Sequence, residues 1–225
     1  MFFDWTFVIL IPALIISFWA QMKIGSTFGK YSKVRSNKGY NGAQVARILL
    51  DSQGLQNVPV ELIPGKLTDH YDPIHRVMRL SSDVFYGDSV ASLGVAAHET
   101  GHAIQHKKMY SPLIIRNKIA PIASFSSNAS WLIFLIGMLF GIGFFARIGV
   151  LLFGAVVVFQ LITLPVEFDA SRRALRILED RSILYADEIA GAKAVLNAAA
   201  MTYVAAALMA VSQLLRLLLI SREER

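Results

Sequence analysis

The sequence contains no cysteine, which excludes disulfide bonds and thiolate metal ligands throughout the chain. A metal ion in this protein must therefore be held by His, Asp or Glu, the ligands typical of catalytic zinc sites. Charged residues are also scarce, at 17% of the 225 residues, whereas 55% are hydrophobic. With a mean hydropathy of +0.50, this composition is too apolar for an ordinary soluble domain. It predicts an integral membrane protein with one modest polar portion.

Four apolar segments are long enough to cross a bilayer as helices. The first has no basic n-region and no small-residue cleavage site, so we interpret it as a retained anchor rather than a cleaved signal peptide. The second and third are expected to be joined by a tight turn, with Arg147 between them. The four segments are 2–22, 131–145 with a weaker lead-in from 119, 148–166 and 197–220.

The net charge of +6 is distributed unevenly along the chain. Segments 23–118 and 167–197 carry 13 and 5 Lys or Arg residues, whereas the rest of the chain carries four. Loops rich in Lys and Arg remain in the cytoplasm. The count therefore predicts that both polar segments are cytoplasmic and that the N-terminus lies outside. It also favours membrane topology over a patch that binds nucleic acid.

Residues 98–102, His-Glu-Thr-Gly-His, form the HExxH pattern. On a helix, residues four apart share one face, so His98 and His102 can hold one Zn²⁺ together. Glu99 is then placed to act as a general base toward water at the metal. The alternative is a surface helix without a metal, but the flanking residues are small and apolar, where unpaired polar groups are costly to bury. Gly101 weakens a helix by about 1 kcal/mol relative to Ala. A glycine at this position therefore indicates that another backbone or a substrate approaches the helix closely.

A catalytic zinc site needs a third protein ligand and an open position. Glu167 is the best candidate, because it follows an apolar segment on a helix that is expected to continue into a polar segment. The other interpretation is an interfacial carboxylate paired with Arg172 or Arg173. Asp169 lies two residues from Glu167, which points the two side chains to opposite faces of a helix. We therefore do not expect both carboxylates to bind the ion.

The segment before the HExxH helix is expected to form a small antiparallel sheet. Alternating apolar residues in 58–63 and 76–81 predict two strands, and 69–73 predicts a turn between them. A sheet edge beside a metal site can pair with an extended peptide, although simple packing of a hairpin explains the pattern equally well. His106, four residues after His102, lies too far along the helix from the first histidine to share the ion, and we expect it to be a polar helix end.

The HETGH motif, the DHYDP and SVASLGVAAHETGHAIQH segments and the distal EFDASRRA motif resemble the YugP-type family of bacterial membrane zinc metallopeptidases, over nearly the whole chain. The chain is more distantly similar to the HtpX and CAAX-prenyl proteases, whose distal Glu-x-x-x-Asp motif supplies a zinc ligand. The Glu of that motif aligns with Glu167, whereas the position of its Asp is occupied by Ser171. Asp169 or another group is then the candidate to orient a ligand histidine. The resemblance also implies a cytoplasm-facing site.

The sequence therefore predicts a mainly α membrane protein with about four transmembrane helices and a cytoplasmic, zincin-like α+β portion. The predicted function is zinc-dependent endopeptidase activity on membrane or membrane-proximal proteins, with one Zn²⁺ held by His98, His102 and Glu167 and with Glu99 as the catalytic base. The competing hypothesis is a metal-binding membrane scaffold or adaptor, against which the intact Glu99 argues. Peptide hydrolysis also requires a hydrogen-bond donor to the oxyanion of the tetrahedral intermediate. The candidates are His70, Tyr71, His75 and Arg172.

These predictions divide the chain into five parts. They are a transmembrane anchor (1–22), a cytoplasmic metallopeptidase portion (23–118), two transmembrane helices (119–166), a cytoplasmic segment with the third ligand (167–197) and a fourth transmembrane helix with a tail (198–225). The expected partners are a protein or peptide substrate and the lipid bilayer of the cytoplasmic membrane, with an accessory membrane protein as a further option. Nucleic acid is not an expected partner.

Overall fold

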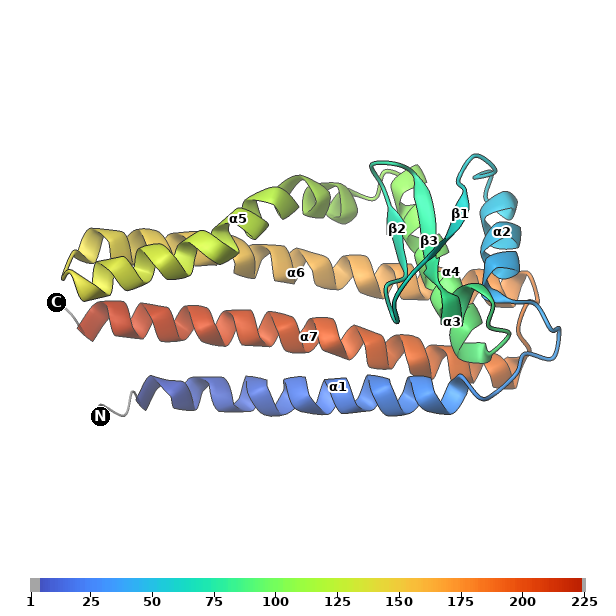
Figure 1. The fold of residues 1–225 in the computed structure, drawn as a ribbon, viewed down its shortest axis with the longest axis horizontal. Coiled ribbons are helices and arrows are strands. Elements are labelled where there is room, and N and C mark those ends of the chain that lie inside the picture. The colour runs from blue at the N-terminus through green and yellow to red at the C-terminus, as the bar shows by residue number, and fades with distance from the viewer. Residues whose placement is uncertain (1–4, 224–225) are drawn as a thin grey trace. The chain divides into compact units, whose positions relative to one another are not determined.

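The computed structural model describes residues 5–223, which are mainly helical and include one small sheet (Figure 1). Residues 1–4 of the predicted anchor and residues 224–225 of the predicted tail lie outside the described residues. The elements in chain order are the 3-10 helix η1 (Trp5–Leu10), α1 (Ile11–Tyr31), α2 (Gly42–Ser52), β1 (Val60–Ile63), β2 (His70–Asp72), β3 (Val77–Ser81), α3 (Ser82–Phe85), α4 (Val90–Lys107), α5 (Ser111–Leu139), α6 (Gly143–Asp180) and α7 (Ala186–Glu223).

The described residues form two compact units. The helical unit contains residues 5–21, 114–165 and 201–223, and the mixed unit contains residues 22–113 and 166–200. Helix α6 contributes its first part to the helical unit and its last part, from Val166 onward, to the mixed unit. All strands and the HExxH helix belong to the mixed unit.

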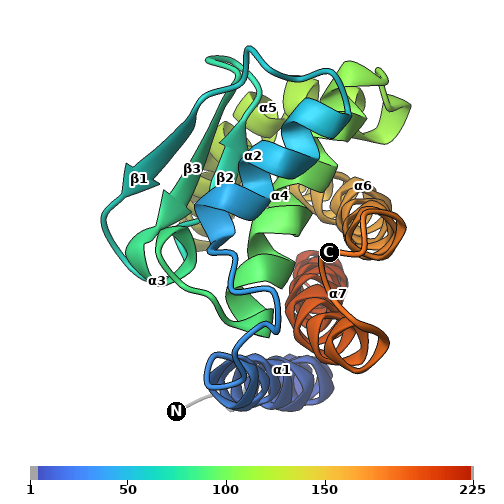
Figure 2. The same ribbon diagram turned by 90° about the vertical axis from the view of Figure 1, so that its right-hand side faces the viewer.

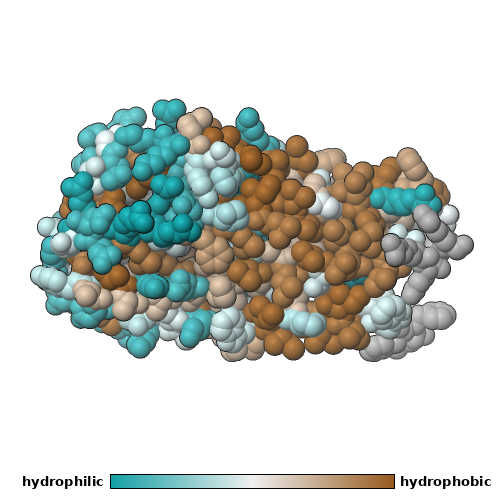
Figure 3. All heavy atoms as spheres, turned by 180° about the vertical axis from the view of Figure 1, so that it is seen from behind, coloured by the Kyte–Doolittle hydropathy of each residue, from teal (hydrophilic) through white to brown (hydrophobic). Residues whose placement is uncertain are grey.

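Within residues 5–223, four helices are long and apolar enough to cross a membrane, as the sequence predicts. In the most apolar stretch of each, only 17% to 33% of the residues are buried inside the protein. Most of these apolar side chains therefore face outward, which suits lipid and would be unfavourable in water. On the face shown in Figure 3, hydrophobic side chains cover most of the helical unit, and hydrophilic side chains gather on the mixed unit. The four helices are Trp5–Tyr31, Ser111–Leu139, Gly143–Asp180 and Ala186–Ser221.

The turn between the second and third of these helices lies earlier than predicted. It occupies residues 140–142, between α5 and α6, whereas Arg147 lies inside α6. Gly141 adopts a left-handed conformation with a φ of 63°, which glycine takes at little cost and which commonly ends a helix. The isolated charge of Arg147 therefore does not mark the turn.

The sheet differs from the predicted antiparallel hairpin, because its strand order is β1-β3-β2. Strand β1 pairs with β3 in parallel, whereas β2 pairs with β3 in antiparallel orientation. The predicted pairing of 58–63 with 76–81 is therefore wrong in direction, and the segment predicted as a turn contains a third strand, β2. The thirteen or so residues between β1 and β3 leave room for the chain to reverse twice, which a parallel pair requires.

Helix α4 packs against α2 and against strands β2 and β3, and α2 and α4 lie on the same face of the sheet (Figure 2). The core between them contains fully buried Leu49, Leu50, Met78, Leu80 and Leu93. Burial of each such side chain contributes about 1.5–3 kcal/mol. The Ser89 side chain caps the N-terminus of α4 by accepting a hydrogen bond from the Ser92 amide. This packing fixes the position of the HExxH helix against one face of the sheet.

The backbone of α6 lies very close to α4 at Gly101. A Cβ atom on this glycine would lie 2.5 Å from the carbonyl oxygen of Ala170 and 3.1 Å from its Cα. Backbone atoms cannot move aside as a flexible side chain can, so the close contact requires glycine. The expectation that another backbone approaches the motif here is confirmed. This contact brings the part of α6 that carries Glu167 beside the motif.

Candidate metal centre

Three of the predicted site residues converge in the mixed unit: His98 and His102 of α4 and Glu167 of α6. One ligand atom from each lies within 4.8 Å of the others, and no other such group occurs among residues 5–223. Glu167 Oε2 lies 3.2 Å from His98 Nε2 and 3.6 Å from His102 Nε2. The side chains of these residues are only 14%, 12% and 3% exposed, in the order His98, His102, Glu167, so water screens their charges weakly.

These distances fit the requirements of a zinc ion. Zinc bonds of 2.0–2.1 Å in tetrahedral geometry place neighbouring donor atoms about 3.3 Å apart, close to the two separations between Glu167 and the histidines. Two imidazoles and one carboxylate are also a donor set typical of catalytic zinc, because they leave a fourth position open. The residues present therefore fit the metal.

His102 is oriented by Gln105, a fully buried side chain that the sequence analysis did not single out. Gln105 Oε1 lies 3.1 Å from His102 Nδ1, while Gln105 Nε2 donates to the Val166 carbonyl at 2.8 Å and to Asp169 Oδ2 at 2.9 Å. Two acceptors around Nε2 fix the direction of the amide, so Oε1 must accept from His102 Nδ1. This arrangement selects the tautomer in which His102 Nε2 presents its lone pair to a metal. Asp169 also accepts from Arg173 Nε at 2.5 Å.

His98 is oriented by a different group. Ser171 Oγ lies 3.1 Å from His98 Nδ1, and Ser171 is nearly buried. Ser171 follows Glu167 by one helical turn, so both side chains face α4. The resemblance implies a carboxylate that orients a ligand histidine. At His98 a hydroxyl, that of Ser171, takes this place. Asp169 contacts His102 only through Gln105. The i,i+4 spacing from Glu167 was the signal for Ser171, and the i,i+3 spacing from His102 was the signal for Gln105.

Replacing Gln105 with Met tests this orientation. The variant keeps a similar volume but removes the acceptor for His102 Nδ1, and loss of such a partner typically weakens metal affinity by about 10–100-fold. We expect that loss in a zinc titration against a competing chelator. Ser171→Ala, which removes the partner of His98, provides the comparison, and thermal unfolding of both metal-free variants separates altered affinity from altered folding. Unchanged zinc affinity in Gln105→Met would contradict the orienting role.

Glu99 is buried beside the histidines and is held by the sheet. Its Oε2 accepts a hydrogen bond from the backbone amide of Tyr71 at 2.9 Å. Tyr71 lies in the middle of β2, which among residues 5–223 pairs with β3 alone. The free edge of this strand therefore faces α4 and fixes the direction of the Glu99 carboxylate.

The charges around His102 favour a cation at the centre. Burial lowers the pKa of the His102 imidazole, but its hydrogen bond to Glu167 and the negative charges of Glu167 and Glu99 outweigh burial and raise that pKa. A proton and a divalent metal ion compete for the same imidazole nitrogen. The surroundings that stabilise a protonated His102 would stabilise a bound metal ion more strongly, because the ion carries two charges.

His106 lies outside the ligand group and is bound to the sheet. Its Nδ1 lies 2.9 Å from the hydroxyl of Tyr71. Burial and the positive charge of Arg76 lower the pKa of His106, so the ring is neutral near pH 7 and its Nδ1 accepts a hydrogen bond from the Tyr71 hydroxyl. Burial also raises the pKa of Tyr71 and keeps its hydroxyl protonated. This agrees with the expectation that His106 is not a zinc ligand.

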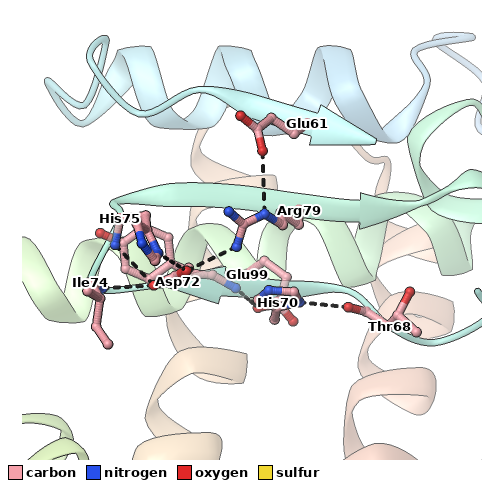
Figure 4. Close-up of polar contacts among 9 residues, drawn as sticks. Glu61, Thr68, His70, Asp72, Ile74, His75, Arg79 and Glu99 are labelled. Atoms are coloured by element: carbon pink, nitrogen blue, oxygen red, sulfur yellow. Dashed lines mark hydrogen bonds and ion pairs between the residues drawn. The ribbon is translucent and has the colours of Figure 1, made fainter. Parts of the chain in front are cut away.

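Among the four candidate oxyanion donors, Tyr71 alone contacts Glu99, through its backbone amide. The ring of His70 binds the Thr68 carbonyl, and that of His75 binds Asp72 on the outer part of the turn (Figure 4). Arg172 is exposed on α6. Of the four candidates, Tyr71 is therefore the one in contact with a predicted site residue.

Comparison with known proteins gives two matches. A family model described as "Putative neutral zinc metallopeptidase" matches residues 6–222. A protein of Bacillus subtilis (strain 168) named "Putative membrane protease YugP" is 51% identical over 210 residues, which cover 93% of each chain. No solved structure matches this chain.

Proposed function

Because the chain belongs to the neutral zinc metallopeptidase family, we propose that it is a zinc-dependent endopeptidase of the cytoplasmic membrane. It acts on membrane or membrane-proximal proteins at a site that faces the cytoplasm. The observation that carries this proposal is the convergence of His98, His102 and Glu167 on one point beside the buried Glu99. The combination of HExxH with a distant glutamate makes the site similar to those of gluzincins.

The residues of the site have separate roles in the proposed peptide hydrolysis. His98, His102 and Glu167 would hold the zinc ion, which would supply Lewis acidity toward the scissile carbonyl and the attacking water. Glu99 accepts a proton from the attacking water and then donates it to the leaving amine. The Tyr71 amide holds the Glu99 carboxylate in one orientation throughout, so little reorganisation accompanies the proton transfers.

We also assign the edge of β2 to substrate binding. An extended peptide can add to a sheet edge through its backbone, and β2 has one neighbour in the sheet. Because Tyr71 of this strand contacts Glu99, a peptide on this edge lies beside the proposed base. Simple packing of β2 against α4 is the alternative explanation of this strand.

Metal removal tests the proposed function against the scaffold hypothesis. We expect the full-length protein in lipid nanodiscs to cleave members of a broad peptide library, to lose this activity with a chelator and to regain it with one equivalent of Zn²⁺. Mass spectrometry of the peptides and metal analysis of the protein provide the readouts. A protein that holds zinc but cleaves no peptide favours the scaffold or adaptor. A protein that binds no zinc contradicts both hypotheses.

The absence of cysteine allows a clean test of the cytoplasmic placement. The distribution of Lys and Arg predicts that Lys66, in the mixed unit, is inside and that Phe140, in the turn between α5 and α6, is outside. A membrane-impermeant maleimide should therefore label Phe140→Cys on spheroplasts, whereas Lys66→Cys should react only after permeabilisation. The parent protein is the unlabelled control, and the reverse pattern would refute a cytoplasm-facing site.

A further inference from the structure

A cavity of about 270 Å³ opens beside the C-terminal end of α4. It continues the face of α4 that carries Glu99, because Ala103, His106 and Lys107 line it. The opposite wall includes Tyr71 and Arg76. The apolar part of the lining consists of Leu55, Val58, Ala103 and Met109. The cavity therefore combines an apolar base with basic and hydrogen-bonding groups, and no acidic residue lines it.

The two cations at the cavity differ in how they are held. Lys107 Nζ donates hydrogen bonds to the carbonyl oxygens of Gln53 and Gly54, so its ammonium group is largely engaged. Arg76 is exposed and makes no hydrogen bond or ion pair with another side chain within residues 5–223. Its guanidinium group is therefore available to an anionic ligand.

The carboxylate of Asp72, in the same turn as Arg76, is engaged by other groups. Asp72 accepts from His75 Nδ1 at 2.7 Å and from Arg79 Nη1 at 3.0 Å, as Figure 4 shows. The hydrogen bond from His75 is the main reason that the pKa of Asp72 is held well below its usual range. Asp72 also accepts from the backbone amides of Ile74 and His75, so both of its oxygens are occupied.

The same turn holds Arg76 in an uncommon backbone conformation. Its φ is 53°, in the left-handed region that side-chain-bearing residues adopt at a cost and that is frequent at functional sites. The Asp72 hydrogen bonds to the turn amides stabilise this conformation. Arg76 is therefore presented at the cavity by a built turn and not by a freely moving loop.

Tyr71 connects the cavity to the metal centre. Its backbone amide binds Glu99, and its hydroxyl lies 2.9 Å from the ring of His106 in the cavity wall. One turn of α4, about 6 Å along the axis, separates His102 from His106. Because a residue of an extended peptide spans about 3.3 Å, the cavity lies about two residues from a bond positioned at the metal.

We propose that this cavity is a substrate subsite in which Arg76 binds a carboxylate of the peptide about two residues from the scissile bond, a proposal that rests on the proposed peptidase function. The carboxylate can belong to an Asp or Glu side chain or to a free C-terminus, because both present the same two oxygens to a guanidinium group. The apolar base of the cavity accommodates the methylene groups that carry the carboxylate.

Matched peptides test the proposal in the zinc-loaded, full-length protein. One set exchanges Glu for Gln at each of the three positions on either side of the scissile bond. A second set exchanges a free C-terminus for an amide. We expect kcat/KM to fall about tenfold when the charge is removed at one position, mainly because KM rises. A change of this size corresponds to the loss of one charge-assisted contact. The set in which the drop occurs identifies the source of the carboxylate.

Two substitutions link the preference to Arg76. Arg76→Gln should abolish the preference for the charged peptide, and Arg76→Glu should reverse it. Lys108→Gln, which removes a neighbouring charge that does not line the cavity, should leave it unchanged. Equal cleavage of all pairs by the parent protein, or a preference that survives Arg76→Gln, would overturn the proposal.

A binding experiment keeps this test separate from the peptidase proposal. Fluorescence anisotropy with the Glu99→Gln protein measures affinity for the same peptide pairs without turnover. If no peptide is cleaved but the charged peptide binds about tenfold more tightly through Arg76, the peptidase proposal fails and the carboxylate site stands. If peptides are cleaved but the pairs bind equally, the subsite is wrong and the peptidase proposal stands.

Discussion

Glu99→Gln is expected to abolish detectable peptide cleavage while zinc remains bound in a one-to-one ratio. The amide has nearly the volume of the carboxylate, and its oxygen can still accept the hydrogen bond from the Tyr71 amide. It cannot take a proton from water, and loss of a general base typically slows a reaction by about 10²–10⁴-fold. The effect should therefore appear in kcat, with zinc content unchanged, when peptide hydrolysis and metal content are measured on the same preparation.

Glu179→Gln is the matched control for this experiment. Glu179 is an exposed carboxylate on α6, so its neutralisation changes the net charge equally but should leave cleavage unchanged. Wild-type cleavage rates in Glu99→Gln would mean that another group accepts the proton. Loss of zinc in the same variant would instead assign Glu99 to the binding of the metal.

The parts of the site that were predictable from the sequence are those determined by a single helix. The spacing of His98 and His102 places both imidazoles on one face whatever surrounds them. Gly101 was also informative, because its local cost to the helix indicated a close neighbour, which is the backbone of Ala170. The apolar segments likewise indicated four candidate spans by length and composition alone.

The parts that were not predictable depend on how distant segments meet. Alternation of apolar residues shows which side chains share a face of a strand but not the direction of its neighbour, so the parallel pairing of β1 with β3 was missed. Gln105 resembles any polar helical residue until α6 supplies the Val166 carbonyl and Asp169 for its amide. Tyr71 acquires its contact with Glu99 only through the position of β2.

The second large effect is expected at Glu167. Glu167→Gln removes the only carboxylate in the ligand group that residues 5–223 provide, and a weak neutral donor takes its place between two imidazoles. With total zinc binding free energies of about 10–16 kcal/mol shared among three or four ligands, loss of one costs about 2.5–5 kcal/mol, which corresponds to about 10²–10⁴-fold weaker binding. Competition with a chelator of known affinity should show this loss, and cleavage should disappear at limiting zinc.

Asp169→Asn distinguishes a ligand from a supporting group on the same helix. Asp169 contacts the centre only through Gln105, so its neutralisation should weaken zinc binding by no more than about 10–100-fold, as for other outer partners of a ligand histidine. Both substitutions remove one negative charge within two residues of each other, so a general electrostatic effect would act similarly on both. A larger loss in Asp169→Asn than in Glu167→Gln would exchange their roles, whereas equal small losses would mean that α6 contributes no ligand. A large loss confined to Glu167→Gln is what the 3.2 Å and 3.6 Å separations between Glu167 and the two histidines require.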